Sequence, residues 1–354
     1  MKMTFRWFGD KFDTITPEQI RQIPAVTGVI ATLYDTLPGE VWERGAVRAL
    51  KARVEKAGLE VSGIESVNIH DAIKAAAPDR DMYIENYIKT LKALGEEGID
   101  LVCYNFMPVF DWTRSDLAKP RPDGSSVLSY DGDIVEKMAF EQMLESLESK
   151  RGEFLLPGWE PERMARNKEL FGIYKGVDET KLRENLGYFL KAIMPACEEY
   201  NIKMAIHPDD PAWSVFGLPR IVKNHEDLQE IVNLVSSPCN GITLCSGSLG
   251  SNPDNDIPAI IRSLKGKIHF AHVRNVKHLG YRKFDETAHL SADGSLDMYR
   301  IMKAFVDIGF DGPLRPDHGR MVWGEKSMPG YGLYDRAMGI CYLSGLLEAI
   351  RKHA

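Results

Sequence analysis

KMAIHP at 203–208, GITLCS at 241–246 and KIHFAHVRN at 267–275 are three short hydrophobic runs, each carrying polar side chains at its end. They are separated by HEDLQEIVNLV at 225–235 and IPAIIRSLKG at 257–266, in which apolar residues recur three and four positions apart. Runs of the first kind predict strands, and the second spacing predicts amphipathic helices. Regular alternation of the two indicates a parallel sheet.

The same alternation continues on both sides of this stretch. In the first gap Thr16 can cap a helix that has Pro17 at its first position, and Gly58 closes the helix of the second gap. Eight strand–helix units predict a closed (β/α)₈ TIM barrel, with 1–354 as a single domain. The five further strands are expected at 5–9 (FRWFG), 26–33 (VTGVIATL), 60–66 (EVSGIES), 100–107 (DLVCYNFM) and 312–318 (GPLRPDH).

One gap is far longer than the others and spans 108–177. It contains a Pro/Gly/Ser-rich piece at 119–133 and helix-period segments at 134–149 and 161–172. Because it leaves the carboxyl-terminal end of the fourth strand, where the active sites of such barrels lie, we expect a helical insertion that acts as a lid or a subunit contact. A plain surface excursion is the alternative.

Composition excludes several classes of protein. With 44 basic and 51 acidic residues the net charge is −7, which does not suit a general nucleic-acid binder. No apolar run approaches the roughly 20 residues that span a bilayer, and the N-terminus lacks a secretory signal. We therefore expect a cytoplasmic protein without nucleic-acid or membrane partners. Five widely spaced cysteines predict no disulfide framework, and those that bind nothing should be packing residues.

Metal-capable side chains fall at the ends of four consecutive predicted strands. They are His207, Cys245, His272 and Asp317. In a parallel barrel these ends meet at one mouth, and two imidazoles, a thiolate and a carboxylate form a plausible set of ligands for a divalent transition ion. Singly, each has an ordinary structural explanation. The thiolate favours zinc or ferrous iron and the carboxylate also admits manganese, so ligand chemistry does not choose the metal.

Other titratable groups lie close to these positions along the chain. His318 follows Asp317 directly and Tyr331 lies shortly beyond, so we expect them to exchange protons with a substrate. A Lewis acid beside such a pair suits removal of a proton α to a carboxylate, as in dehydration, isomerisation or epimerisation of sugar derivatives. Four residues of the seventh strand end and the loop after it are expected to bind the substrate: Arg274, Asn275, His278 and His289. Solvation of His278 and a structural ion pair of Arg274 are the alternatives.

Long stretches of the chain resemble the mannonate dehydratase family. The matching segments include VCYNFMPVFDWTR, KLRENLGYFLKAIMP, MAIHPDDP, LCSGS, HFAHVRNVK, ETAHLSADGSLDMY and RPDHGR. The resemblance implies a xylose-isomerase-like TIM barrel that converts D-mannonate to 2-keto-3-deoxy-D-gluconate and water in glucuronate catabolism. It implies Mn²⁺ or Fe²⁺ as cofactor. His207, Cys245, His272 and Asp317 match the family's ligand motifs, and His318 and Tyr331 match its acid–base pair.

The chain departs from the family's pattern at Tyr34 and Asp35, where other members carry a pair of histidines. A different substrate contact near that strand end is therefore expected. A metal-dependent isomerase or epimerase with the same barrel is the alternative function, and a non-catalytic metal-binding protein is a second. Because barrels with long inserts on one face often pair through them, we expect a homodimer or a higher homo-oligomer.

Overall fold

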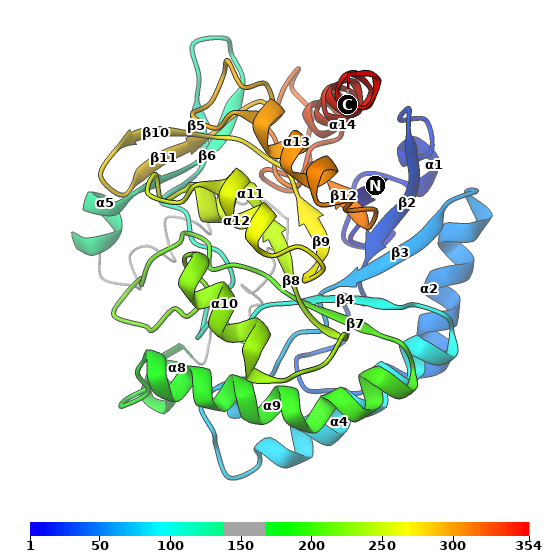
Figure 1. Ribbon diagram of the computed structural model, residues 1–354, viewed down its shortest axis with the longest axis vertical. Coiled ribbons are helices and arrows are strands. Elements are labelled where there is room, and N and C mark those ends of the chain that lie inside the picture. Colours follow the sequence, from blue (N-terminus) through cyan, green and yellow to red (C-terminus); the bar gives the residue numbers. More distant parts are fainter. Residues whose placement is uncertain (138–166, 354) are drawn as a thin grey trace.

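Eight parallel strands close into a barrel in the order β1-β12-β9-β8-β7-β4-β3-β2 (Figure 1). The computed structural model describes residues 1–137 and 167–353. The predicted TIM barrel is therefore confirmed. Its strands are β1 (Lys2–Arg6), β2 (Val26–Ala31), β3 (Glu60–Glu65), β4 (Leu101–Tyr104), β7 (Lys203–Ile206), β8 (Asn240–Cys245), β9 (Ile268–His272) and β12 (Pro313–Arg315).

The first strand begins earlier in the chain than its hydrophobic run suggests. We expected it at 5–9, but the ladder with β2 ends with the pair Arg6 and Ile30. Phe8 belongs instead to a second hydrophobic cluster, which also contains Trp112 and Tyr331. The apolar run is long because its first residues pack in the barrel core and Phe8 packs in the second cluster. The spacing of hydrophobic residues in the sequence does not show where one core ends and the other begins.

Helices cover the outside of the barrel, and local sequence signals explain where several begin. Thr16 and Gln19 form a reciprocal capping box at α1, with Pro17 as the first helical residue, as predicted. The described helices are α1 (Pro17–Ile20), α2 (Arg44–Lys56), α3 (Asp71–Lys74), α4 (Arg80–Glu96), α5 (Gly132–Lys137), α8 (Asn167–Ile173), α9 (Glu179–Glu199), α10 (His225–Leu234), α11 (Ser246–Gly250), α12 (Ile257–Ser263), α13 (Met298–Asp307) and α14 (Leu333–Lys352).

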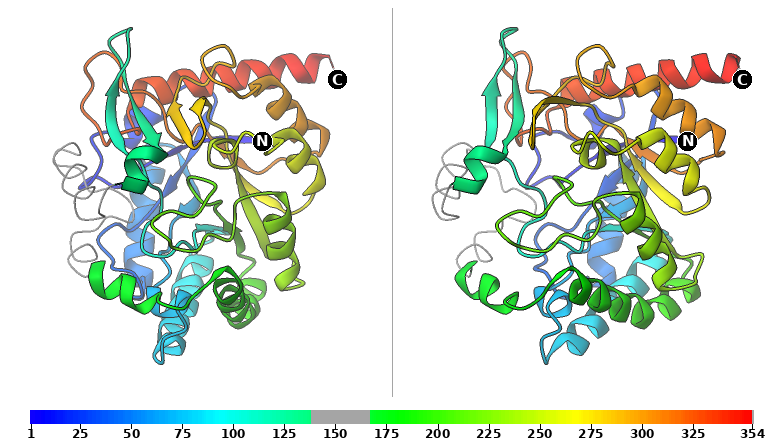
Figure 2. Two further views of the ribbon diagram at one scale, coloured as in Figure 1. Left: turned by 90° about the vertical axis from the view of Figure 1, so that its left-hand side faces the viewer. Right: turned by 60° about the vertical axis from the view of Figure 1, so that its left-hand side comes forward.

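A second sheet stands beside the barrel and was not predicted. This sheet is antiparallel, in the order β10-β11-β6-β5. Figure 2 shows its β5–β6 hairpin, in teal, projecting away from the barrel. The Pro/Gly/Ser-rich piece of the insertion forms this hairpin, β5 (Asp116–Pro120) and β6 (Ser126–Asp131). The loop after β9 supplies β10 (Val276–Gly280) and β11 (Lys283–Glu286). The sheet therefore joins two segments that are distant in the sequence.

Of the helix predicted at 134–149 the structure describes only 134–137, in α5, and of the helix predicted at 161–172 it describes 167–172, in α8. The lid role of 108–177 and the single-domain organisation remain predictions. Among the cysteines, Cys103, Cys197 and Cys239 are buried as expected, but the expectation of packing is wrong for Cys341, which is exposed on α14. No helix in the described part of the chain is long and apolar enough to cross a membrane.

Candidate active site

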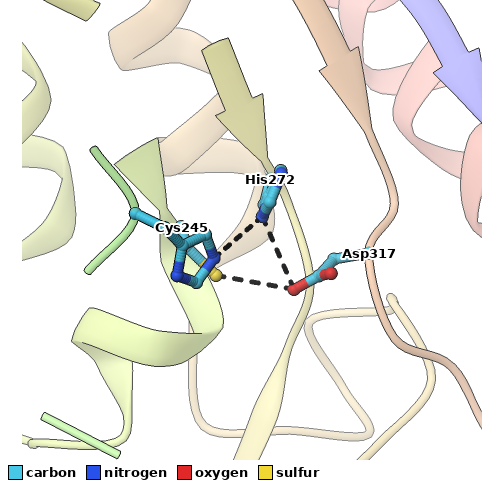
Figure 3. Close-up of side chains that lie close together, drawn as sticks. Cys245, His272 and Asp317 are labelled. Carbon is cyan, nitrogen blue, oxygen red and sulfur yellow. Dashed lines mark hydrogen bonds and ion pairs between the residues drawn. The ribbon is translucent and has the colours of Figure 1, made fainter. Parts of the chain in front are cut away.

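The four predicted metal-ligand residues come together at the carboxyl-terminal mouth of the barrel. Their ligand atoms all lie within 4.8 Å of one another. Cys245 and His272 end β8 and β9, His207 follows β7 directly, and Asp317 lies two residues beyond β12. Because these strands are neighbours in the barrel, side chains that leave their ends converge, and Figure 3 shows Cys245, His272 and Asp317 pointing toward one another.

The hydrogen bonds of His207 leave one ring nitrogen available for a metal. Nδ1 lies 2.7 Å from the carbonyl oxygen of Pro208, which can only accept, so Nδ1 carries the proton and Nε2 keeps its lone pair. That Nε2 faces Nδ1 of His272 at 3.1 Å. Oδ2 of Asp317 lies 3.8 Å from the same Nδ1 of His272 and 3.5 Å from Sγ of Cys245. Nitrogen, sulfur and oxygen donors thus face one another across a small volume.

Two further features suit a bound divalent cation. Oε2 of Glu65 is buried and makes no hydrogen bond, although it lies 3.4 Å from Nε2 of His272. Nε2 of His272 also accepts a hydrogen bond from Nε of Arg315 at 3.0 Å, and Arg315 pairs with Glu65 at 2.8 Å, so these two residues hold the ring from behind, as the outer partners of a metal-bound histidine would. Sγ of Cys245 accepts hydrogen bonds from the backbone N–H and hydroxyl of Ser248. The donor set fits the predicted ion.

Asp317 is held as an anion. Burial by itself would raise the pKa of this carboxyl, but Arg315, His318, His272 and Arg274 together hold it well below its usual range. Nε of Arg274 donates to Oδ2 at 2.7 Å, and Nη1 of Arg315 lies 2.8 Å from Oδ1. The carboxylate is therefore ionised and fixed in orientation before any ligand binds.

His318 and Tyr331 form a hydrogen-bonded pair beside the ligand cluster. Nε2 of His318 lies 2.8 Å from the Tyr331 hydroxyl, and Nδ1 lies 2.8 Å from Oε1 of Glu286. A carboxylate only accepts, so Nδ1 carries the proton, and the Tyr331 hydroxyl donates to the free lone pair of Nε2. Burial, and then the charge of Asp317, raise the pKa of Tyr331 well above its ordinary value. Tyr331 is therefore a neutral proton donor in this structure.

Arg274 was predicted to bind substrate, but the structure engages it in a buried ion network. Its guanidinium contacts Asp210 at 2.6 Å and Glu286 at 3.2 Å besides Asp317. Arg114, from the start of the insertion, contacts the same Asp210 and Glu286. The ion pair that was the alternative is therefore present, and Arg274 does not line the central cavity; its contact with a substrate stays a prediction that the geometry does not favour.

The other three predicted substrate-binding residues also lie away from that cavity. The amide of Asn275 donates to the carbonyl of Leu290, and Nε2 of His278 and of His289 lie against backbone carbonyl oxygens. Their substrate contacts stay predictions that the geometry does not favour. Tyr34 packs edge-on against Phe8, and Asp35 pairs with Lys11 on the surface.

Several residues that line the cavity were not predicted from the sequence. Arg6 ends β1, Glu65 ends β3 and Arg315 ends β12, so the strand-end rule that found the ligands could have found them too. Asp210 shares the loop of His207 and also lines the cavity. Glu286 had no such signal, because it ends a strand of the second sheet. Glu286 pairs with Val276, the first residue of β10. Because Val276 follows shortly after the end of β9, this pairing places Glu286 at the mouth of the barrel.

These features define the class: a (β/α)₈ TIM barrel with a cluster of four metal-capable side chains at the carboxyl-terminal mouth of its strands. A xylose isomerase domain protein from Planctomyces limnophilus shares the fold, with a TM-score of 0.55 at 12% identity over 99% of this chain and 98% of that one. The family model of D-mannonate dehydratase (UxuA) matches residues 1–354, and the chain belongs to this family.

Individual relatives agree with the family match. A mannonate dehydratase of Brachyspira hyodysenteriae is 68% identical over 352 residues, which cover 99% of each chain. The crystal structure of mannonate dehydratase from Streptococcus suis serotype 2 superimposes with a TM-score of 0.87 at 44% identity, covering 100% of this chain and 95% of that one. The predicted resemblance is thereby confirmed, and the chain is an enzyme of the hydro-lyase class. The comparisons do not favour the isomerase or the non-catalytic alternative.

Proposed function

We propose that the protein dehydrates D-mannonate to 2-keto-3-deoxy-D-gluconate with Mn²⁺ or Fe²⁺ held by His207, Cys245, His272 and Asp317. The observation that carries this proposal is the position of the His318–Tyr331 pair directly beside four ligand atoms that lie within 4.8 Å of one another. A divalent ion bound there supplies Lewis-acid stabilisation of the negative charge that develops at the substrate carboxylate.

The hydrogen bonds support one order of the two proton transfers. Nε2 of His318 takes the C2 proton, because Glu286 holds the other ring proton on Nδ1. The electron pair of the C2–H bond forms the C2–C3 double bond, and the C3–O bond breaks. Tyr331 gives its hydroxyl proton to the departing oxygen, which leaves as water. His318 then returns its proton to Tyr331 across their 2.8 Å contact, and the released enol becomes the ketone.

Glu286 acts in this scheme as a positioning residue. It touches His318 but does not line the cavity, and it is buried among the guanidinium groups of Arg114 and Arg274. Burial alone would raise its pKa, yet Arg274, His318 and Arg114 hold the pKa of Glu286 at about 2. A permanently ionised acceptor at Nδ1 keeps the ring orientation and the tautomer that the base requires.

Metal-free protein reconstituted with Mn²⁺, or anaerobically with Fe²⁺, tests the proposal. We expect D-mannonate to yield a 2-keto-3-deoxy product lighter by one water, and His318→Asn and Tyr331→Phe to abolish it at saturating metal. A product of equal mass would instead show an isomerase or epimerase. Loss of activity in air with Fe²⁺ but not with Mn²⁺ would identify iron as the oxygen-sensitive form. The cytoplasmic location and the homodimer or higher homo-oligomer stay predictions.

A further inference from the structure

Arg6 is a buried cation at the mouth of the barrel. It is the last residue of β1, the strand that pairs with β12 just before Asp317. Its side chain lines the central cavity together with Tyr331 and Glu65, and the residue is only 4% exposed. Arg6 therefore faces the same space as the proposed acid–base pair.

Among the described residues Arg6 has no counterion, unlike most of the other buried arginines there. Six arginines are buried in the described part of the chain, and four of them form ion pairs with buried or half-buried carboxylates: Arg114, Arg220, Arg274 and Arg315. Within the described residues no carboxylate lies within 4.0 Å of Arg6. Glu65, which also lines the cavity, pairs with Arg315 at 2.8 Å instead.

The donors of Arg6 are only partly used. Nη1 donates to the carbonyl oxygens of Ile30 and Trp7 at 3.2 and 3.4 Å, and the guanidinium lies over the ring of Phe8. Nε and Nη2 make no hydrogen bond to any part of the chain that the structure describes. Arg336 also lacks a carboxylate partner among the described residues, but each of its three nitrogens donates to a backbone carbonyl.

Burying a guanidinium without a counterion is unfavourable. Burial is the main reason why the pKa of Arg6 lies below its usual range. In Arg274 and Arg315 burial acts in the same direction, but neighbouring carboxylates raise the pKa above its ordinary value. An anion that enters the cavity beside Arg6 would remove this penalty, and a guanidinium with two unused donors matches the planar fork of a carboxylate.

We propose that Arg6 binds the carboxylate of the sugar acid and is the residue that makes the site select acids over neutral sugars. This inference rests on the proposed function and names the group that recognises the charge of its substrate. It has a chemical consequence as well. Removing the C2 proton adds negative charge to a group that is already an anion, so a cation at the carboxylate stabilises the transition state more than the ground state.

Steady-state kinetics with a charged and a neutral ligand test this. Mn²⁺-loaded wild type and Arg6→Met are compared for kcat/KM on D-mannonate and for the Ki of D-mannonamide, which keeps every hydroxyl but carries no charge. We expect Arg6→Met to lower kcat/KM for the acid by roughly 10- to 100-fold and to change the Ki of the amide less than about threefold, as for loss of a charged hydrogen bond. Arg6→Lys should recover part of the loss, because it restores the charge without the fork.

Arg220→Met is the matched control, since it removes a second buried arginine, which pairs with Asp209 and does not line the cavity. We expect it to leave the discrimination between acid and amide unchanged. If Arg6→Met does not fold, Arg6→Gln keeps donors for the two carbonyls and serves in its place. Equal losses for acid and amide, or no loss, in an active enzyme would overturn the role of Arg6 alone. A wild type that does not dehydrate mannonate would overturn the proposed function as well.

Discussion

Nδ1 of His318 lies 2.8 Å from Oε1 of Glu286, so a carboxylate of the second sheet orients a histidine of the barrel. β11 carries Glu286 and pairs with β6 of the insertion on one side and with β10 on the other. The insertion therefore contributes to the proposed acid–base pair through the second sheet, of which its hairpin forms two strands. This relationship gives the second sheet a chemical role.

Glu286→Gln should lower kcat by roughly 10- to 100-fold and change KM little, because the amide no longer fixes the tautomer of His318. Steady-state kinetics on D-mannonate at saturating metal measure the two constants separately. Asp335→Asn is the control, since it removes another buried, ion-paired carboxylate that does not contact His318. A similar fall in kcat in both variants would show that general destabilisation explains the loss.

Cys245→Ser should weaken metal binding by at least about 10-fold, because a hydroxyl is a harder and less readily ionised ligand than a thiol. Titration of the metal-free protein with Mn²⁺ or Fe²⁺ measures the affinity. Cys341→Ser changes an exposed cysteine far from the site and should leave the affinity as it is. An unchanged affinity in Cys245→Ser would remove the sulfur from the proposed ligand set.

Glu65→Gln should also weaken metal binding, by roughly 10- to 100-fold, although Glu65 is not itself a proposed ligand. Arg315 loses the charge that it pairs with at 2.8 Å, and Arg315 in turn donates to Nε2 of His272 at 3.0 Å, so the ring of a proposed ligand is held less firmly. The same titration measures the effect. Glu60→Gln, at the exposed start of the same strand, is the control, and equal affinities in the two variants would contradict the role of Glu65.

His269, on β9, should make the fold sensitive to mild acid. Burial is the main cause that lowers its pKa to about 4, from an ordinary value of 6.5, and Nδ1 lies 2.9 Å from the carbonyl of Met204. Between these two pH values the unfolded chain binds a proton that the folded chain does not. Stability is therefore full above pH 6.5 and falls as the pH drops toward 4, by about 3 kcal/mol in total.

Urea unfolding at several pH values between 7 and 4 checks this expectation. His269→Gln should flatten the fall in the free energy of unfolding relative to wild type, whatever other groups contribute in the same range. His225→Gln, at a half-buried position on α10, should follow the wild-type curve. Parallel curves for wild type and His269→Gln would contradict the assignment.

Much of the fold could be predicted because strands and helices have different periods. The runs that became β7, β8 and β9 end in His207, Cys245 and His272, and parallel strands bring such ends to one edge. The cluster of metal-capable groups thus follows from counting strands. The boundary of β1 was wrong by three residues because the hydrophobic run FRWFG contributes to two separate cores.

The substrate-binding residues were harder to predict, because a residue's type does not reveal its partner. Arg274 and Arg6 are both arginines near strand ends, yet Arg274 is saturated by Asp210, Glu286 and Asp317, and Arg6 has no counterion among the described residues. The difference depends on which carboxylates the fold places beside each. Only coordinates reveal that, since Asp210 and Glu286 lie 64 and 12 positions from Arg274.

By itself the sequence determined the barrel, the family and the group of metal-capable side chains, since period, strand order and long matching segments are properties of the chain read in one dimension. Only the tertiary structure decided the second sheet, the contact of Glu286 with His318 and the lack of an ion pair at Arg6 within the described part of the chain. Each of these depends on a strand register or a packing contact between segments that are distant in the sequence. Such contacts are selected by the free energy of the whole fold, so no local stretch of sequence reveals them.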